Sequence, residues 1–307
     1  MTPLGELTAG ALAMALARWL VWIGALGVAG AVGSLGLLRR FDTTLPDSAI
    51  AIFLRRVAST GAAAAIVLAA ALALVLAAQV YSWFGTEGLT NRDEIRMLVG
   101  ETRWGQQWLA AAQAAAAVVA LALAALVFRG ARSGLLGVGA IAATLTVPLI
   151  GHGAAHGTLN WLAHAAHLAG AGLWLGSLAV LARATAVLWR DDSPSPAALA
   201  SLLHQFSTLA LTGAAMVVGS GLYLAWLHIT PFETLWTTEY GRTLAIKLGA
   251  LAIVMLLGWR NWQRVVPAIG EPGGLRAIRA SMRLELTFAS GGVLLLTAWL
   301  SGLPVPG

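Results

Sequence analysis

Apolar residues fill long uninterrupted stretches of this chain, without the alternation of a half-buried strand or the single apolar face of a surface helix. One stretch, GAAAAIVLAAALALVLAA at residues 61–78, is apolar on every side of a helix and approaches the ~20 residues that cross a bilayer. Eight such segments can be counted, with limits near residues 9–38, 57–84, 104–128, 134–153, 159–182, 204–228, 242–260 and 284–303. A membrane barrel would need strands of alternating polarity, so we predict an all-α integral membrane protein with eight transmembrane helices.

Composition agrees with this pattern. The chain is 59% hydrophobic and 10% charged, whereas an ordinary soluble domain carries about 25% charged residues. The mean hydropathy is +0.80. We therefore expect the lipid bilayer to be the main partner of the chain.

The basic residues report on topology. The net charge is +6, but the basic residues lie at the ends of the apolar segments and form no binding face, so no nucleic-acid partner is expected. Thirteen lysines and arginines gather on one side of the predicted spans and six on the other. The positive-inside rule puts the larger group in the cytoplasm, and both termini are then periplasmic.

A weak internal repeat relates the two halves of the chain. WLVWIGALGVAGAVGSLGLL at residues 19–38 resembles WLAHAAHLAGAGLWLGSLAVL at residues 161–181. We predict two four-helix halves, residues 1–153 and 154–307, in the same orientation about an axis along the membrane normal. The alternative is a chance similarity between helices rich in alanine, leucine and glycine. In this alignment Trp22 stands where the second half has His164.

Four of the six histidines lie between residues 152 and 167. His152 and His156 are four residues apart and His164 and His167 are three apart, so each pair shares one helix face. At about 1.5 Å of rise per residue, His152 lies about 6 Å below the connecting turn and the second pair about 8–13 Å below it. We predict that His152, His164 and His167 surround one position on the periplasmic side, completed by His156 or His228.

Such a cluster at membrane depth favours a bound ligand or a proton relay over simple packing. Imidazole suits copper, zinc, iron and nickel and does not suit calcium or magnesium. The chain has no cysteine, which excludes disulfides and thiolate metal sites. These residue types alone do not choose copper over zinc. Elsewhere, we expect Lys247 to extend outward from its span, and Glu285 to pair with Arg283 or a neighbouring arginine.

The segments GHGAAH, HLAGAGLWLGSL, FSTLALTGAAMVVGSGLYLAWLH, TTEYGRTLAIKL and RLELTFASGGVLLLTAWLSG together resemble the copper resistance protein D (CopD) family. The similarity is best over residues 150–303, while the first half agrees mainly in its span layout. The resemblance implies a multi-pass protein of the bacterial inner membrane that moves copper, as Cu(I) or Cu(II), usually inward. The family histidines carry over onto His152 and His167, and His156 and His164 are additional.

The resemblance also implies a partner. Family members are often paired with, or fused to, a periplasmic copper-binding domain of the CopC type, and no such domain stands among the apolar segments. We therefore expect a separate CopC-type carrier. The predicted outer loops, Ser82–Arg103 and Thr230–Tyr240, are either ordinary solvated loops or a docking rim for that carrier, through the acidic residues Glu87, Asp93, Glu94, Glu101, Glu233 and Glu239.

Three functions remain open at this point. The first is a copper transport protein that is not an enzyme, driven by a gradient or by another protein because no ATP-binding motif appears. The second is a b-type haem electron carrier, whose axial ligands would be two of these histidines. The third is a membrane assembly factor that transports nothing.

Overall fold

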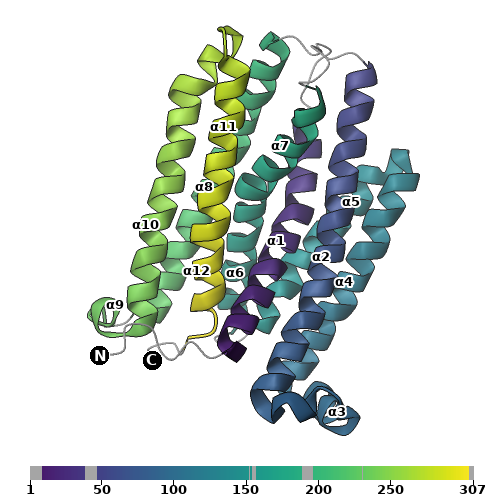
Figure 1. The fold of residues 1–307 in the computed structure, drawn as a ribbon, viewed down its shortest axis with the longest axis vertical. Helices are drawn as coiled ribbons and strands as arrows, with labels where there is room; N and C mark the ends of the chain where they lie inside the picture. The colour runs from purple at the N-terminus through teal and green to yellow at the C-terminus, as the bar shows by residue number, and fades with distance from the viewer. Residues whose placement is uncertain are drawn as a thin grey trace.

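The protein is described by a computed structural model that covers residues 9–38, 47–151, 153, 157–188, 196–229 and 231–303. Within these residues every regular element is a helix, and the long helices lie side by side along one axis of the molecule (Figure 1). The predicted all-α class is confirmed.

The first half contributes four long helices and a short one. These are α1 (Ala9–Leu38), α2 (Asp47–Gly88), α3 (Arg92–Glu101), α4 (Arg103–Val127) and α5 (Arg132–Thr146). A 3-10 turn, Arg129–Ala131, joins α4 to α5, and a second one, Val147–Ile150, extends α5 around Pro148.

The second half is interrupted by π-helical turns. Its elements are α6 (Gly157–Ala171), a π turn (Gly172–Gly176), α7 (Ser177–Leu188), α8 (Pro196–His228), α9 (Thr234–Thr237), α10 (Glu239–Arg260), a π turn (Asn261–Val265), a 3-10 turn (Pro267–Gly270), α11 (Gly274–Thr287), a π turn (Phe288–Leu294) and α12 (Leu295–Leu300). The runs α6–α7 and α11–α12 are each continuous through their π turns.

Seven helices of the described chain are long and apolar enough to cross a membrane, namely Ala9–Leu37, Asp47–Gly88, Arg103–Val127, Arg129–Ile150, Gly157–Ala186, Ala197–Leu227 and Glu239–Val265. The eighth predicted segment falls in the run Gly274–Leu300, which is not among the seven and carries Arg276, Arg279, Arg283 and Glu285 in its first part. This run packs along α10 and ends beside the start of α1 (Figure 1). Its crossing of the membrane, the periplasmic location of the termini and the two-fold repeat stay predictions.

The two predicted outer loops contain helices. The first holds α3, which begins because the Asn91 side chain accepts hydrogen bonds from the backbone N–H groups of Asp93 (3.1 Å) and Glu94 (3.4 Å). The second holds α9. The hydroxyls of Thr102 and Thr238 then cap α4 and α10 by accepting from the N–H three residues later. Polar capping residues thus order segments whose polarity alone predicted loops.

Glycines bring the helices that surround the site into backbone contact. A Cβ atom on Gly30 of α1 would collide with the backbone of Gly176, and one on Gly170 of α6 would lie 2.7 Å from the carbonyl oxygen of Gly213 on α8. Small residues of this kind let helices approach closely where lipid supplies no hydrophobic driving force. The α6–α7 run is consequently held between α1 and α8.

Candidate functional site: a histidine-lined cavity

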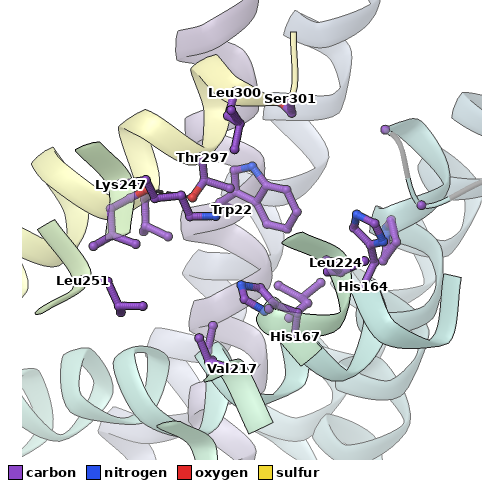
Figure 2. A pocket seen from close by; sticks show the side chains of 18 of the residues that line it. Trp22, His164, His167, Val217, Leu224, Lys247, Leu251, Thr297, Leu300 and Ser301 are labelled. Atoms are coloured by element: carbon purple, nitrogen blue, oxygen red, sulfur yellow. Dashed lines mark hydrogen bonds between the residues drawn. The ribbon is translucent and has the colours of Figure 1, made fainter. Parts of the chain in front are cut away.

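A cavity of about 270 Å³ lies among α1, α6, α8, α10 and α12 (Figure 2). Its walls are mainly apolar and include Val21, Leu26, Leu168, Val217, Leu251 and Val293. The polar side chains that reach it are Arg18, His164, His167, Tyr240, Lys247, Thr297 and Ser301. We call this space the histidine cavity. No carboxylate is among its lining residues in the described part of the chain.

His167 is held by α8. Its Nδ1 lies 3.1 Å from the hydroxyl oxygen of Ser220, and that hydroxyl donates its own hydrogen to the carbonyl oxygen of Met216 at 2.5 Å. When the hydroxyl hydrogen points to Met216, the shorter of its contacts, Nδ1–H of His167 donates to Ser220. In the neutral imidazole this places the lone pair on Nε2, the nitrogen through which the ring can bind a metal ion.

His164 is fixed within its own helix. Its Nδ1 lies 2.9 Å from the carbonyl oxygen of Asn160, one turn earlier on α6. A carbonyl oxygen can only accept, so Nδ1 donates, and the lone pair of the neutral ring is again on Nε2. His164 and His167 both line the histidine cavity, as their spacing predicts.

The other predicted ligands are less completely described. His152 and His156 lie outside the described residues, and His228 ends α8 with a side chain that also lies outside them. The sequence neighbours of His152, Gly151 and Gly153, both line the cavity. Across the described residues, no group of three metal-ligating His, Asp or Glu side chains is assembled. The five-histidine ligand set therefore stays a prediction.

Gly153 is anchored to α6 by a side chain of that helix. The side-chain amide of Asn160, which is fully buried, donates to the carbonyl oxygen of Gly153 at 3.2 Å. Trp161 donates from its indole nitrogen to the carbonyl oxygen of Leu145 on α5 at 2.8 Å. Gly153 is therefore tied to α6, and α6 is tied to α5.

Lys247 differs from its prediction. It lines the cavity together with Trp22 and His167 instead of extending away from the bundle (Figure 2). An ionisable residue at membrane depth usually faces the interior of a bundle, and here the cavity provides that interior. Arg18 lines the same cavity from α1. The sequence shows both residues as isolated charges in apolar runs, but it does not show which way they face.

Glu285 also differs from its prediction. Its side chain is only 3% exposed, and its carboxylate accepts a hydrogen bond from the Asn261 amide at 2.9 Å, while Arg283 is exposed. The predicted pair with Arg283 is therefore wrong, because residues two positions apart on a helix point to nearly opposite sides of it.

Comparison with known protein families matches both halves of the chain. The family described as copper resistance protein D matches residues 200–300, and the one described as copper resistance protein D-like, N-terminal domain, matches residues 8–161. The resemblance therefore extends through the first half, where sequence reasoning found agreement mainly in span layout.

Among individual proteins, the chain is 30% identical over 92 residues to the "Copper transport protein CutJ" of Bacillus subtilis (strain 168). The aligned part covers 30% of this chain and 17% of that relative. No solved structure matches the chain significantly. The match to the N-terminal domain alone spans half of the 307 residues, and with the second match beyond it the chain belongs to the copper resistance protein D family.

Proposed function

We propose that this chain carries copper ions across the bacterial inner membrane, inward, and that it takes the ion at the histidine cavity from the periplasmic side. The chain is a multi-pass membrane protein of a copper family, and its relative is named for copper transport. The observation that carries the proposal is the pair His164 and His167, which line one cavity with both Nδ1 atoms already engaged in hydrogen bonds.

The surroundings of the remaining histidines support the same position for the ion. Gly151 and Gly153 flank His152 in the sequence, and both line the cavity. Leu224 and Ala225 of α8 also line it, and they precede His228 by about one helical turn. A site completed by imidazoles from α6, α8 and the α5–α6 connection would give copper a set of nitrogen ligands that suits it.

The two cations of the cavity fit a site that releases its ion. Arg18 and Lys247 stand in the same cavity as the two histidines. Their positive charges oppose a bound metal cation and so shorten its stay. Conduction requires binding that is favourable enough for entry and weak enough for departure.

The proposed orientation has a direct test. The 13-to-6 distribution of basic residues places the connections that hold α3 and α9 outside. A single cysteine introduced at Thr90 or Leu235 of this cysteine-free chain should react with a membrane-impermeant reagent in intact cells, and one at Gly270 should not. Reaction of the cysteine at position 270 alone would show that the chain has the opposite orientation in the membrane.

The haem alternative predicts a different arrangement. The axial ligands of one haem stand on opposite faces of its ring, whereas His164 and His167 lie three residues apart on the same face of α6. The described histidines thus favour a compact ion over a ring held between them. An absorption spectrum of the purified protein without a haem band agrees with the copper proposal. A haem band would favour the haem electron carrier instead.

The proposed function is tested by removing the two described ligands. Full-length His164→Ala/His167→Ala protein should lose bound copper on metal analysis and lose copper uptake in proteoliposomes. His204→Ala is the matched control, because His204 is exposed near the start of α8 and does not line the cavity. Equal copper content and uptake in the double variant and the control would refute the proposed site.

A further inference from the structure

A second buried polar group lies on the far side of Trp174 from the histidine cavity. Its members are Glu285 and Ser281 of α11, Asn261 at the end of α10, and Trp174, and we call it the Glu285 cluster. Exposures are 3% for Glu285, 4% for Trp174, 5% for Ser281 and 8% for Asn261. Of these side chains only that of Trp174 also lines the histidine cavity, and none is a proposed copper ligand.

Hydrogen bonds in the cluster all point toward the carboxylate. The Asn261 amide nitrogen donates to Oε2 of Glu285 at 2.9 Å, and the indole N–H of Trp174 donates to the same carboxylate. The hydroxyl of Ser281 donates to the amide oxygen of Asn261, and Arg260 donates to that hydroxyl at 3.5 Å. The chain of donors therefore begins at a cation and ends at Glu285.

This arrangement does not suit a metal ion. The two neighbours of the carboxylate present hydrogens to it instead of lone pairs, and a metal ion needs several lone pairs around it. A proton needs only the carboxylate. Protonation would turn Glu285 into a donor, and the Asn261 amide would then turn over so that its oxygen accepts. Burial favours the neutral acid, whereas the converging donors favour the carboxylate. The two effects therefore act in opposite directions on the protonation of Glu285.

The other charged groups near Glu285 that are named below do not bond directly to its carboxylate. On the elements that pack against α11, Arg183 of α7 and Arg264 of the π turn after α10 are exposed. On α11 itself, Arg276 and Arg283 are exposed and Arg279 is half-buried. Arg260 reaches the carboxylate only through Ser281 and Asn261. Lys247, in the first half of α10, lines the histidine cavity.

Trp174 connects the cluster to the histidine cavity. Its side chain lines the cavity and its indole N–H bonds to Glu285. Each contributing helix also changes to π-helical geometry here, with Trp174 in the turn Gly172–Gly176, Asn261 beginning the turn Asn261–Val265, and the turn Phe288–Leu294 following Glu285. Single π turns within α-helices occur frequently at functional sites.

We propose that Glu285 is a proton-binding site whose proton is released when an ion enters the histidine cavity and is taken up again when the ion leaves. The inference rests on the proposed function for its ion. A cation in the cavity stabilises the carboxylate, and the ionised carboxylate in turn stabilises the cation, because coupling between two sites is reciprocal. Glu285 thereby couples the binding of one copper ion to the release of one proton to solvent, and the departure of the ion to the uptake of a proton.

Infrared difference spectroscopy of the purified full-length protein tests this link. Addition of copper should remove the carbonyl band of one protonated carboxyl group in the wild type, a signal that no histidine, lysine or arginine can produce. The band should be absent in Glu285→Gln and retained in Glu271→Gln, the same substitution at an exposed position before α11. In proteoliposomes Glu285→Gln should bind copper roughly 5- to 150-fold more weakly, the usual range of such coupling. It should also take copper up more slowly, and Glu285→Asp should restore part of both.

The outcomes separate this inference from the proposed function. Copper that binds without any change in the carboxyl band, or normal uptake by Glu285→Gln, overturns the inference and leaves the copper site standing. If the wild type binds no copper, the proposed function fails. A pH titration without copper then decides, because a carboxyl band that titrates in the wild type and is missing in Glu285→Gln supports the proton site, and no such band overturns it.

Discussion

The histidine cavity and the Glu285 cluster place polar groups inside the helix bundle in two opposite ways. In the cavity, two imidazoles and two cations face an apolar space, and no carboxylate lines it in the described part of the chain. In the cluster, the side chains satisfy one another through a continuous chain of hydrogen bonds that ends on a carboxylate. The cavity is therefore arranged to receive a ligand, and the cluster to hold an exchangeable proton.

Trp174 connects these two regions. One aromatic residue lines the cavity and donates to Glu285, so that a change of charge on one side is felt on the other. Both regions contain buried side chains, and the cavity offers a ligand about 270 Å³. Ligand binding should therefore stabilise the protein through the cavity alone, and the predictions that follow probe this contrast from the largest effect to the smallest.

The largest expected effect is stabilisation by copper. At a free copper concentration 100 times its Kd, the wild type should gain about 2.7 kcal/mol in its free energy of unfolding, by mass action. Glu285→Gln should still gain stability but less than the wild type, because its cavity is intact while the carboxylate that stabilises the ion is gone. Thermal unfolding in detergent with and without copper measures the gain. A copper-dependent shift in unfolding temperature that survives in His164→Ala/His167→Ala but vanishes in Glu285→Gln would show that copper binds at the Glu285 cluster and not in the cavity.

The second prediction concerns the residue that orients His167. In Ser220→Ala the acceptor of the Nδ1–H disappears, and copper affinity should fall about tenfold, the lower end for loss of a group that orients a metal-binding histidine. Ser207→Ala is the matched control, since Ser207 bonds only to the backbone of its own helix α8 at 2.9 Å. Competition with a chromophoric chelator gives both affinities, and equal values would show that Ser220 does not position the ring.

The third prediction concerns the charge of Lys247. Lys247→Met keeps an unbranched apolar side chain of similar length and removes a positive charge from the cavity, so copper affinity should rise about fivefold, or about 1 kcal/mol. Uptake should slow because the ion leaves less readily. Arg96→Met removes a charge from an exposed position on α3 and should change neither property. A fall in affinity for Lys247→Met would mean that the lysine helps to bind the ligand.

Sequence patterns predicted the helices well because apolar length is a strong signal. The first and third predicted segments agree with α1 and α4 to within a residue. The second begins ten residues too late, because α2 continues through the polar residues Arg55 and Arg56, and hydropathy does not record helix continuation outside the membrane. The segments 82–103 and 230–240 were predicted as loops for the same reason, although α3, which Asn91 caps, and α9 form there.

The cavity could be predicted only in part. Helical spacing placed His164 and His167 on one face, and both line the cavity. Contacts between distant helices were not predictable from spacing, because they depend on how each helix is rotated in the bundle. Lys247 faces the cavity and Glu285 meets Asn261 and Trp174 for this reason. Trp22 was marked only by its place opposite His164 in the repeat, and it lines the same cavity.

The smallest expected effect concerns the acidic residues around α3 and α9, one interpretation of which, from the sequence, is a docking rim for a CopC-type carrier. Glu87, Asp93, Glu101 and Glu233 are exposed, and the short helices that follow or contain them lie at the same end of the bundle as the start of α1 (Figure 1). Replacing these four residues by lysine should slow copper transfer from a copper-loaded carrier by about two- to threefold at low salt, because exposed charges act mainly on the rate of association.

Copper binding by the purified variant should stay unchanged, since none of the four residues lines the cavity. Stopped-flow transfer at low and high salt gives the measurement, and the difference from wild type should shrink as salt screens the charges. If transfer and copper binding fall together, these acids shape the cavity from a distance and the docking surface lies elsewhere. If transfer falls equally at both salt concentrations, the variant has changed the fold of α3 and not an electrostatic contact.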